Sequence, residues 1–141
     1  MKQFFGMSQR GSLDEALQGV YHPQFIMLFS TNDRFEEHVA ALEKRFPGVP
    51  SIGCIGMGYQ SGIVENGVAV AAFSEGVTAA ANVLEQASTM PVKYIKRLEQ
   101  DIQTVNGSSR DTVCIDFCSG NDACVLTTIY TALHKRGISL M

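Results

Sequence analysis

The chain alternates short apolar runs with stretches in which apolar residues recur at helical spacing, a pattern typical of helices covering a sheet. Gln24–Ser30 is apolar on both faces, as in a central strand. The next stretch predicts a helix that Asn32 or Asp33 caps, with an inward stripe at Phe35, Val39, Leu42 and Phe46. Pro47 ends this helix, and a strand at Ile52–Ile55 completes a βαβ unit.

The glycine-rich stretch Gly48–Ser74 carries almost no charge and predicts the centre of the fold. Within it, Gln60–Glu65 and Val68–Phe73 are predicted strands joined by an Asn-Gly turn at residues 66–67, which indicates a hairpin. The alanine-rich run Val77–Leu84 is predicted to be a further strand, because β-branched residues flank its alanines. These strands would form an antiparallel meander beside the βαβ unit.

Helical spacing returns on either side of this region. Near the start, the capping-box pattern Ser12-Leu13-Asp14-Glu15 begins a short helix that extends to about Gly19. A longer helix is predicted from Met90, with an apolar stripe at Val92, Ile95, Leu98, Ile102 and Val105. The asparagine and glycine at residues 106–107 end it.

The last part of the chain predicts a strand, a helix and a final strand. Thr112–Phe117 is apolar apart from Asp116, and Ser119 or Asn121 caps a helix with Ala123, Leu126, Ile129, Tyr130 and Leu133 inward. Gly137 closes that helix, and residues 138–141 begin a strand in which the sequence stops, as expected for a piece of a longer protein.

The pattern as a whole predicts a single α/β domain over residues 1–141, with residues 1–22 as a short leading helix and linker. Its expected architecture is a mixed β-sheet with an initial βαβ unit, a central antiparallel meander and helices packed on the sheet.

The composition predicts a cytoplasmic domain. Of the 141 residues, 45% are hydrophobic and 18% charged, with a net charge of −3, so the chain is globular and lacks the basic surface of a nucleic-acid-binding protein. No apolar run approaches the roughly 18 residues that span a bilayer. The amino terminus has no signal-peptide pattern. The four cysteines lie mostly in apolar runs without zinc spacing, as expected for reduced, buried thiols.

Motifs for nucleotide binding, catalysis and metal binding are absent. Gly53–Gly58 contains G-x-x-G-x-G, but a strand follows it, whereas a dinucleotide fingerprint needs a helix there. Cys54 has no base that the sequence identifies, so we do not expect an enzyme. His38 and His134 are predicted on the polar sides of their helices, and His22 precedes a proline, so all three are expected to be solvated.

The segments Phe25–Ser30, Arg45–Cys54 (R-F-P-G-V-P-S-I-G-C) and Val68–Phe73, with the hairpin between the last two, resemble the N-terminal half of a FIST sensory domain. The resemblance covers about residues 24–141, and the segment 116–120 fits it. It implies an intracellular input module of signal-transduction proteins with chemotaxis-type or kinase outputs, followed by a C-terminal half that this sequence lacks. The family usually has a Gly-Glu pair after residues 53–54, and this chain has lost that acid.

This resemblance implies a cytosolic domain that binds a small metabolite such as an amino acid and passes the signal to an output domain or kinase. The expected ligand-binding groups are polar side chains near strand ends: Ser30, Asn32, Cys54, Tyr59, Asp116 and Ser119. Asp116 has an equal alternative, in which it caps the next helix or binds a buried amide.

Two other functions remain open at this point. Some family members are reported to sense nitric oxide with haem, so the chain could carry haem on a His or Cys ligand, although no cofactor is expected. From a different class, the chain could be a homo-oligomerising assembly module that pairs exposed sheet edges.

Overall fold

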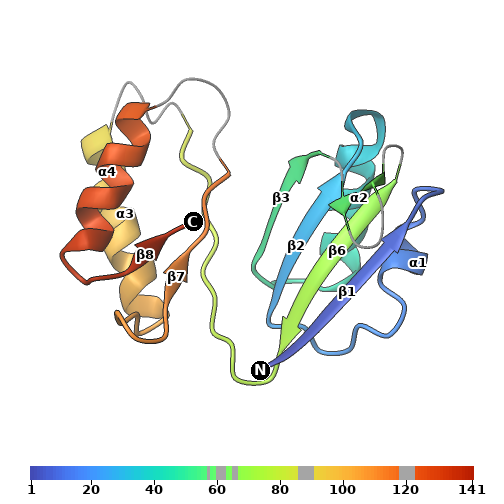
Figure 1. Ribbon diagram of the computed structural model, residues 1–141, viewed down its shortest axis with the longest axis horizontal. Helices are drawn as coiled ribbons and strands as arrows, with labels where there is room; N and C mark the ends of the chain where they lie inside the picture. Colours follow the sequence, from blue (N-terminus) through green and yellow to red (C-terminus); the bar gives the residue numbers. More distant parts are fainter. Residues whose placement is uncertain (57, 60–62, 65–66, 86–90, 118–122) are drawn as a thin grey trace. The chain divides into compact units, whose positions relative to one another are not determined.

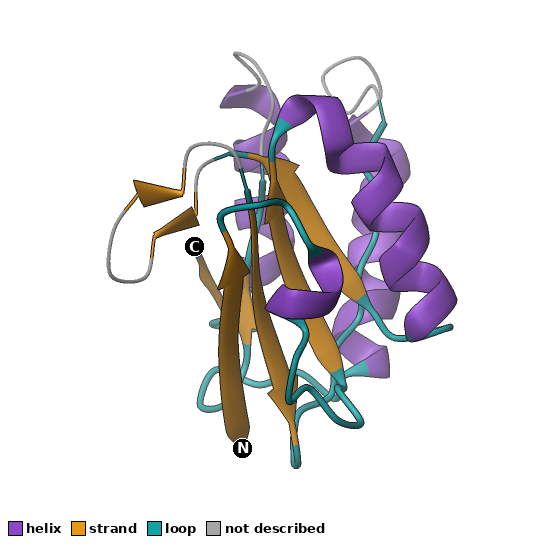
Figure 2. Ribbon diagram, turned by 90° about the vertical axis from the view of Figure 1, so that its right-hand side faces the viewer, coloured by secondary structure: helices purple, strands orange, loops and turns teal. Residues whose placement is uncertain are grey.

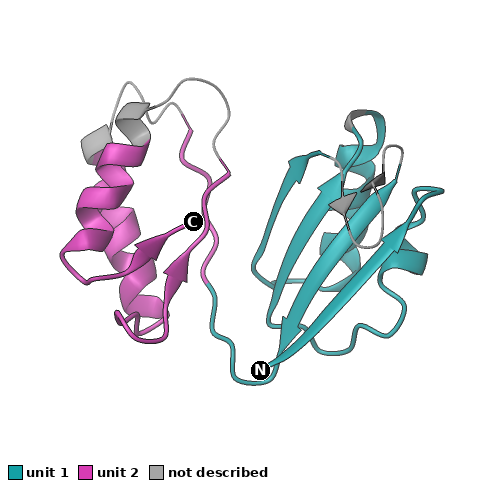
Figure 3. Cartoon of the chain, in the orientation of Figure 1, with its two compact units in different colours: residues 1–79 teal, residues 80–141 magenta. Residues whose placement is uncertain are grey.

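The computed structural model describes residues 1–56, 58–59, 63–64, 67–85, 91–117 and 123–141 (Figure 1). The chain divides into two compact units, unit 1 at residues 1–79 and unit 2 at residues 80–141 (Figure 3). Each unit is an α/β structure with its own apolar core. No helix among the described residues is long and apolar enough to cross a membrane.

Unit 1 is built on a four-stranded mixed sheet with the order β1-β6-β2-β3 (Figure 1). The strands are β1 (Lys2–Ser8), β2 (Phe25–Ser30), β3 (Ser51–Ile55) and β6 (Val68–Ser74). Strands β2 and β3 are parallel and are joined through α2 (Phe35–Arg45), which confirms the predicted βαβ unit. Strand β6 lies between β1 and β2 and is antiparallel to both.

The core of unit 1 lies on the face of the sheet that α1 (Leu13–Ala16) and α2 cover (Figure 2). Burial alternates along β2, where Ile26, Leu28 and Ser30 are buried and their neighbours are partly exposed. Alternate residues point to opposite faces of a strand, so this alternation identifies the covered face. The core residues are Leu13, Ala16, Leu17, Val20, Ile26, Leu28, Leu42, Val68, Val70 and Ala72.

Strand β1 was not predicted, because the segment K-Q-F-F-G-M-S shows no regular alternation of apolar and polar residues. It pairs with β6 along its whole length, from Lys2 opposite Ser74 to Ser8 opposite Val68. Gly6 in its middle lies against α1, where an added Cβ would fall 2.0 Å from the carbonyl oxygen of Ala16. This close approach explains why a glycine is found in the strand.

The strand predicted at Val77–Leu84 is wrong, since residues 77–84 form neither strand nor helix. Side chains satisfy part of this backbone instead, because Val77 N donates to Gln24 Oε1 and Val83 O accepts from Arg97 Nη1. The predicted hairpin is also different: Val68–Ser74 pairs with β1 and β2, whereas β5 (Ile63–Val64) pairs with β4 (Gly58–Tyr59). The turn at residue 66 lies outside the described residues.

Unit 2 packs α3 (Pro91–Thr104) and α4 (Ala123–His134) with a parallel pair of short strands, β7 (Val113–Cys114) and β8 (Ser139–Leu140). Both helices and the final strand confirm the prediction, although the strand predicted at 112–117 is shorter. Gly137 closes α4 with φ +66°, the left-handed conformation that favours glycine. The unit's core consists of Tyr94, Ile102, Ile129, Leu133 and Ile138.

Some helix predictions had the wrong phase or the wrong cap. In α2 the buried residues are His38 and Leu42, whereas Val39 is 40% exposed. Neither Asn32 nor Asp33 caps this helix, because both belong to the 3₁₀ turn η1 (Asn32–Arg34) that precedes it. In α4, Leu126 and Tyr130 were predicted inward and are exposed. The proposed caps of α4, at residues 119 and 121, lie outside the described residues.

Candidate functional site at the strand-end edge of the sheet

The carboxyl ends of β2 and β3 lie at the same edge of the unit 1 sheet, because the two strands are parallel. One row of aligned residues crosses the sheet there, with Ser8 opposite Val68, Val68 opposite Ser30, and Ser30 opposite Ile55. We call this row, with residues 31 and 54–56 beside it, the strand-end edge. Ser8, Val68 and Ser30 are buried, whereas Ile55 is exposed on the outermost strand.

Main-chain hydrogen bonds fix the segments that leave this edge. Gly56 N donates to Ser30 O at 3.1 Å, and Thr31 N donates to Gly67 O at 3.3 Å. We call the segment that begins at Gly56, directly after β3, the glycine-rich bend. Its first residue is therefore bonded to the end of β2, and the residue after β2 is bonded to the residue before β6. Open sheets with parallel strands bind ligands at edges of this kind.

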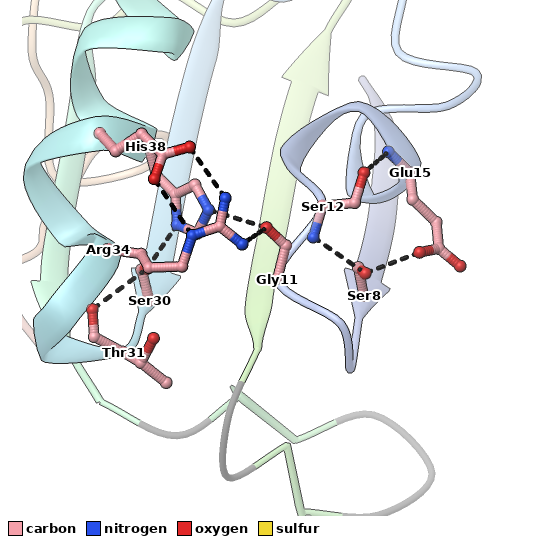
Figure 4. Close-up of polar contacts among 9 residues, drawn as sticks. Ser8, Gly11, Ser12, Glu15, Ser30, Thr31, Arg34 and His38 are labelled. Carbon is pink, nitrogen blue, oxygen red and sulfur yellow. Dashed lines mark hydrogen bonds and ion pairs between the residues drawn. The ribbon is translucent and has the colours of Figure 1, made fainter.

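A buried side-chain pair supports the end of β2 from the covered face (Figure 4). Ser30 Oγ lies 2.6 Å from Nδ1 of His38, and Nε2 of His38 lies 3.0 Å from Gly11 O. Ser30 is 0% exposed and His38 is 2% exposed. The prediction of a solvated His38 is therefore wrong, and the sequence reasoning missed this contact.

Arg34 reaches the same carbonyl oxygen from the start of α2 (Figure 4). Its Nη1 donates to Gly11 O at 2.7 Å, while Nε and Nη2 donate to the two carboxylate oxygens of Glu37 at 3.1 and 2.8 Å. These hydrogen bonds and the charge of Arg34 hold the pKa of Glu37 below its ordinary value, and Glu37 in turn raises the pKa of Arg34. The fork geometry of the guanidinium suits this double contact.

The other side of Gly11 is stabilised by the cap of α1 (Figure 4). Ser12 Oγ accepts from Glu15 N at 3.3 Å, which confirms half of the predicted capping box. In place of a direct hydrogen bond from Ser12 N to the Glu15 carboxylate, Ser8 bridges the two. Its hydroxyl donates to Glu15 Oε2 at 2.6 Å and accepts from Ser12 N at 3.1 Å. The hydrogen bond from Ser8, with the charge of Arg10, lowers the pKa of Glu15 from its ordinary value.

The predicted site residues are only partly brought together. Ser30 and Cys54 both lie at the strand-end edge, where Cys54 pairs in register with Phe29. Asn32 follows in η1 and Tyr59 lies in β4, but the structure does not describe their side chains. Asp116 belongs to unit 2, where its amide donates to Met141 O at 3.0 Å, and residue 119 lies outside the described part of the chain.

Neither Cys54 nor Ser30 is presented as an activated nucleophile at this edge. Burial raises the pKa of the Cys54 thiol, which favours the unreactive protonated form. The Ser30 hydroxyl points at His38 but is closed off from solvent, so a substrate has no access to it. Partly exposed groups that can contact a ligand are Thr31, Cys54 and the backbone of Gly56.

His38 is the described histidine whose contacts oppose an axial role toward haem. Both ring nitrogens of His38 are engaged by Ser30 and Gly11, His22 is exposed, and His134 is exposed and stacks on Tyr130. Burial also raises the pKa values of the Cys54 and Cys114 thiols, which opposes a thiolate ligand. Within the described ranges, no group of three or more His, Cys, Asp or Glu residues could hold a metal ion.

His38, Ser8, Gly11 and Arg34 are the residues of this region that sequence reasoning missed. A signal for His38 was present, because positions 35, 38, 42 and 46 form as regular a helical stripe as 35, 39, 42 and 46. A histidine in an apolar stripe needs a polar partner in the core. The serine that ends the buried strand β2 was the candidate for that partner.

Comparison with known proteins gives a family and no individual relative. No curated protein and no solved structure matches the chain significantly. The FIST N domain matches residues 24–141, which include β2, α2, β3 and β6 of unit 1 and all of unit 2. The resemblance noted in the sequence is confirmed, and the chain belongs to the FIST N domain family, a family of sensory domains of signal-transduction proteins.

Proposed function

We propose that this chain is a cytosolic, non-catalytic input domain that binds a small metabolite at the strand-end edge of unit 1 and signals to an output domain, such as that of a chemotaxis-type receptor. The observation that supports the proposal most directly is the strand-end edge itself. There, two parallel strand ends, a glycine-rich bend and the partly exposed Thr31 and Cys54 come together in a family of sensory domains.

The chemistry of the edge favours a ligand held by backbone hydrogen bonds and apolar contact. Gly56 has a backbone that a ligand can approach closely, because an added Cβ there would meet Cys54 Sγ only at 3.9 Å. Ile55 is 55% exposed beside it and offers apolar contact. No carboxylate occupies residues 55–60, so this segment offers no partner for a ligand ammonium group, and small carboxylates are as suitable there as amino acids.

A thermal-shift screen of the full chain against amino acids and small carboxylates tests the proposal. A ligand at about 100 times its Kd should stabilise the protein by roughly 2.7 kcal/mol, which raises the unfolding temperature. Cys54→Ala should weaken this response, whereas Ser51→Ala, at the opposite and exposed end of the same strand, should leave it unchanged. An equal response in both variants would remove Cys54 from the ligand site.

The contribution predicted for Asp116 is tested separately. Asp116→Asn keeps the size of the side chain and removes its charge, so a charge-dependent ligand contact should weaken without loss of the fold. Haem belongs in the same screen with absorption as the readout, because a Soret band on the purified mixture would redirect the proposal to haem. A screen without any response across these compound classes would contradict the proposed ligand class.

A further inference from the structure

His38 is a buried side chain that contacts two segments far from it in the sequence (Figure 4). Its Nε2 lies 3.0 Å from Gly11 O, in the loop between β1 and α1, and its Nδ1 lies 2.6 Å from Ser30 Oγ, at the end of β2. Only 2% of the surface of His38 is exposed, so water does not replace either hydrogen-bond partner. One imidazole therefore joins the amino-terminal segment to the strand-end edge.

The roles of the ring nitrogens follow from their partners. A carbonyl oxygen only accepts hydrogen bonds, so Nε2 donates to Gly11 O. In the neutral ring Nδ1 is then the acceptor, and Ser30 donates its hydroxyl proton to it. The distance of 2.6 Å between Ser30 Oγ and His38 Nδ1 is shorter than the 3.4 Å between Ser30 Oγ and Thr31 O, so the hydrogen bond to His38 is the stronger of the two.

The contact continues from Ser30 into the glycine-rich bend. Ser30 O accepts from Gly56 N at 3.1 Å, so the residue whose hydroxyl meets His38 also holds the first turn of the bend. At the other end, Gly11 belongs to residues 1–23, which lie outside the family match at residues 24–141. The Arg34 guanidinium also donates to Gly11 O, but its other hydrogen bonds are to the Glu37 carboxylate, so it does not extend the contact to Ser30.

We propose that His38 is a positioning residue, which ties the amino-terminal segment at Gly11 to the strand-end edge at Ser30 and so sets the geometry of the bend at Gly56. This inference rests on the proposed function, because the bend at Gly56 is where the proposed ligand contacts the protein. The amino-terminal segment is thereby part of the binding domain, and its attachment controls the shape of the site.

Two substitutions separate the two halves of the contact. In His38→Asn, an amide takes the place of Nδ1 and still accepts from Ser30, but it does not reach Gly11. In His38→Gln, an amide takes the place of Nε2 and still donates to Gly11, but it leaves Ser30 without its partner. Arg34→Met is the matched control, because it removes the other donor to Gly11 and leaves the contact between His38 and Ser30 intact.

Amide hydrogen exchange of the full chain without ligand, measured by NMR, provides the readout. We expect exchange at Gly56 to accelerate about fivefold in His38→Gln, and exchange at Gly11, whose amide donates to Ser8 O, to accelerate similarly in His38→Asn. Arg34→Met should leave Gly56 unchanged. The amide of Ile26, bonded to Pro50 O at the opposite end of the sheet, should exchange as in the wild type throughout.

Two results would overturn the proposal. One is an unchanged Gly56 in His38→Gln, and the other is a uniform acceleration that includes Ile26, since this indicates general loss of stability. The wild-type protein offers a check that needs no variant, because a slowly exchanging proton on Nε2 of His38 is required. None of these measurements uses a ligand, so a failed ligand screen and a failed positioning role give different results.

Discussion

Polar side chains in the core of unit 1 are each matched to a partner. Ser8, Ser30 and His38 are the buried polar residues of the described chain, and every buried side-chain nitrogen or oxygen atom there has a hydrogen-bond partner. A buried polar group without a partner keeps the full cost of its desolvation. Ser30 at the end of β2 and His38 in α2 are therefore tolerated only as a pair.

Removal of one member of this pair should destabilise the protein more than removal of an exposed serine. Ser30→Ala leaves Nδ1 of His38 buried without a partner, so we expect a loss of about 1–3 kcal/mol in the free energy of unfolding. Ser51→Ala, on an exposed position of the same sheet, should change it by less than about 0.5 kcal/mol. Urea unfolding followed by circular dichroism measures both, and equal midpoints would argue against the buried pair.

Gly6 and Gly56 provide a second comparison at single residues. An added Cβ at Gly6 would lie 2.0 Å from Ala16 O, a backbone atom that a side-chain rotation cannot move, whereas at Gly56 it would only touch Cys54 Sγ at 3.9 Å. Gly6→Ala should therefore cost about 1–3 kcal/mol of stability through displacement of α1. Gly56→Ala should be neutral or slightly stabilising, because alanine restricts the unfolded chain. Similar thermal midpoints for the two variants would contradict this packing.

At the scale of elements, α1 shows how a helix of four residues persists. Its length gives few internal hydrogen bonds, so the cap and the burial of Leu13 and Ala16 stabilise it. The cap depends on β1, because Ser8 at the end of that strand joins Glu15 to Ser12 N. Strand and helix therefore form together, and neither is stable as a local unit.

This cap should make stability depend on pH in a defined direction. The pKa of Glu15 is lowered in the folded protein, chiefly by the hydrogen bond from Ser8. The stabilisation is therefore present above the ordinary carboxyl pKa and is lost as the pH falls through the lowered value. Wild type should exceed Glu15→Gln in urea midpoint at pH 7, and the difference should disappear in acid.

The matching control is Ser8→Ala, which removes the principal cause of the lowered pKa. A Glu15→Gln substitution made in that background should change the urea midpoint less at pH 7 than it does in the wild-type chain. A difference between wild type and Glu15→Gln that persists unchanged to low pH would show that the carboxylate charge is not involved.

At the scale of the whole molecule, the amino-terminal segment completes unit 1 although it lies outside the family match. It contributes β1, which covers the edge of β6, and α1, whose Leu13 and Ala16 enter the core. Removal of residues 1–23 would expose Val68 and Val70 and leave Gly11's two donors, His38 and Arg34, without their acceptor.

We therefore expect a chain of residues 24–141 to lose the cooperative unfolding of unit 1 and to aggregate through the open edge of β6. A chain that lacks only Met1 serves as the control, since it keeps all of β1. Size-exclusion chromatography and thermal unfolding compare the two chains. A monomeric, cooperatively unfolding 24–141 chain would show that the amino-terminal segment is dispensable.

The sequence by itself determined the βαβ unit, helices α3 and α4, and the family. Two-sided apolar strands, helical stripes, and stop signals such as Gly137 act over a few residues, so they can be read locally. The segment around Arg45–Cys54 carried the resemblance that the family match confirmed. The local signals were also sufficient to place Ser30 and Cys54 at ends of neighbouring parallel strands.

Tertiary structure alone decided the rest. Strand β1 is specified by its pairing with β6 and by the approach of Ala16 to Gly6, contacts between residues far apart in sequence. Residues 77–84 pair with none of the described strands, so their β propensity has no partner to act on. His38 faces the core because Ser30 and Gly11 supply its hydrogen bonds there. Two helical stripes of α2, one through residue 38 and one through residue 39, are equally regular in the sequence, and the contacts of His38 with Ser30 and Gly11 decided between them.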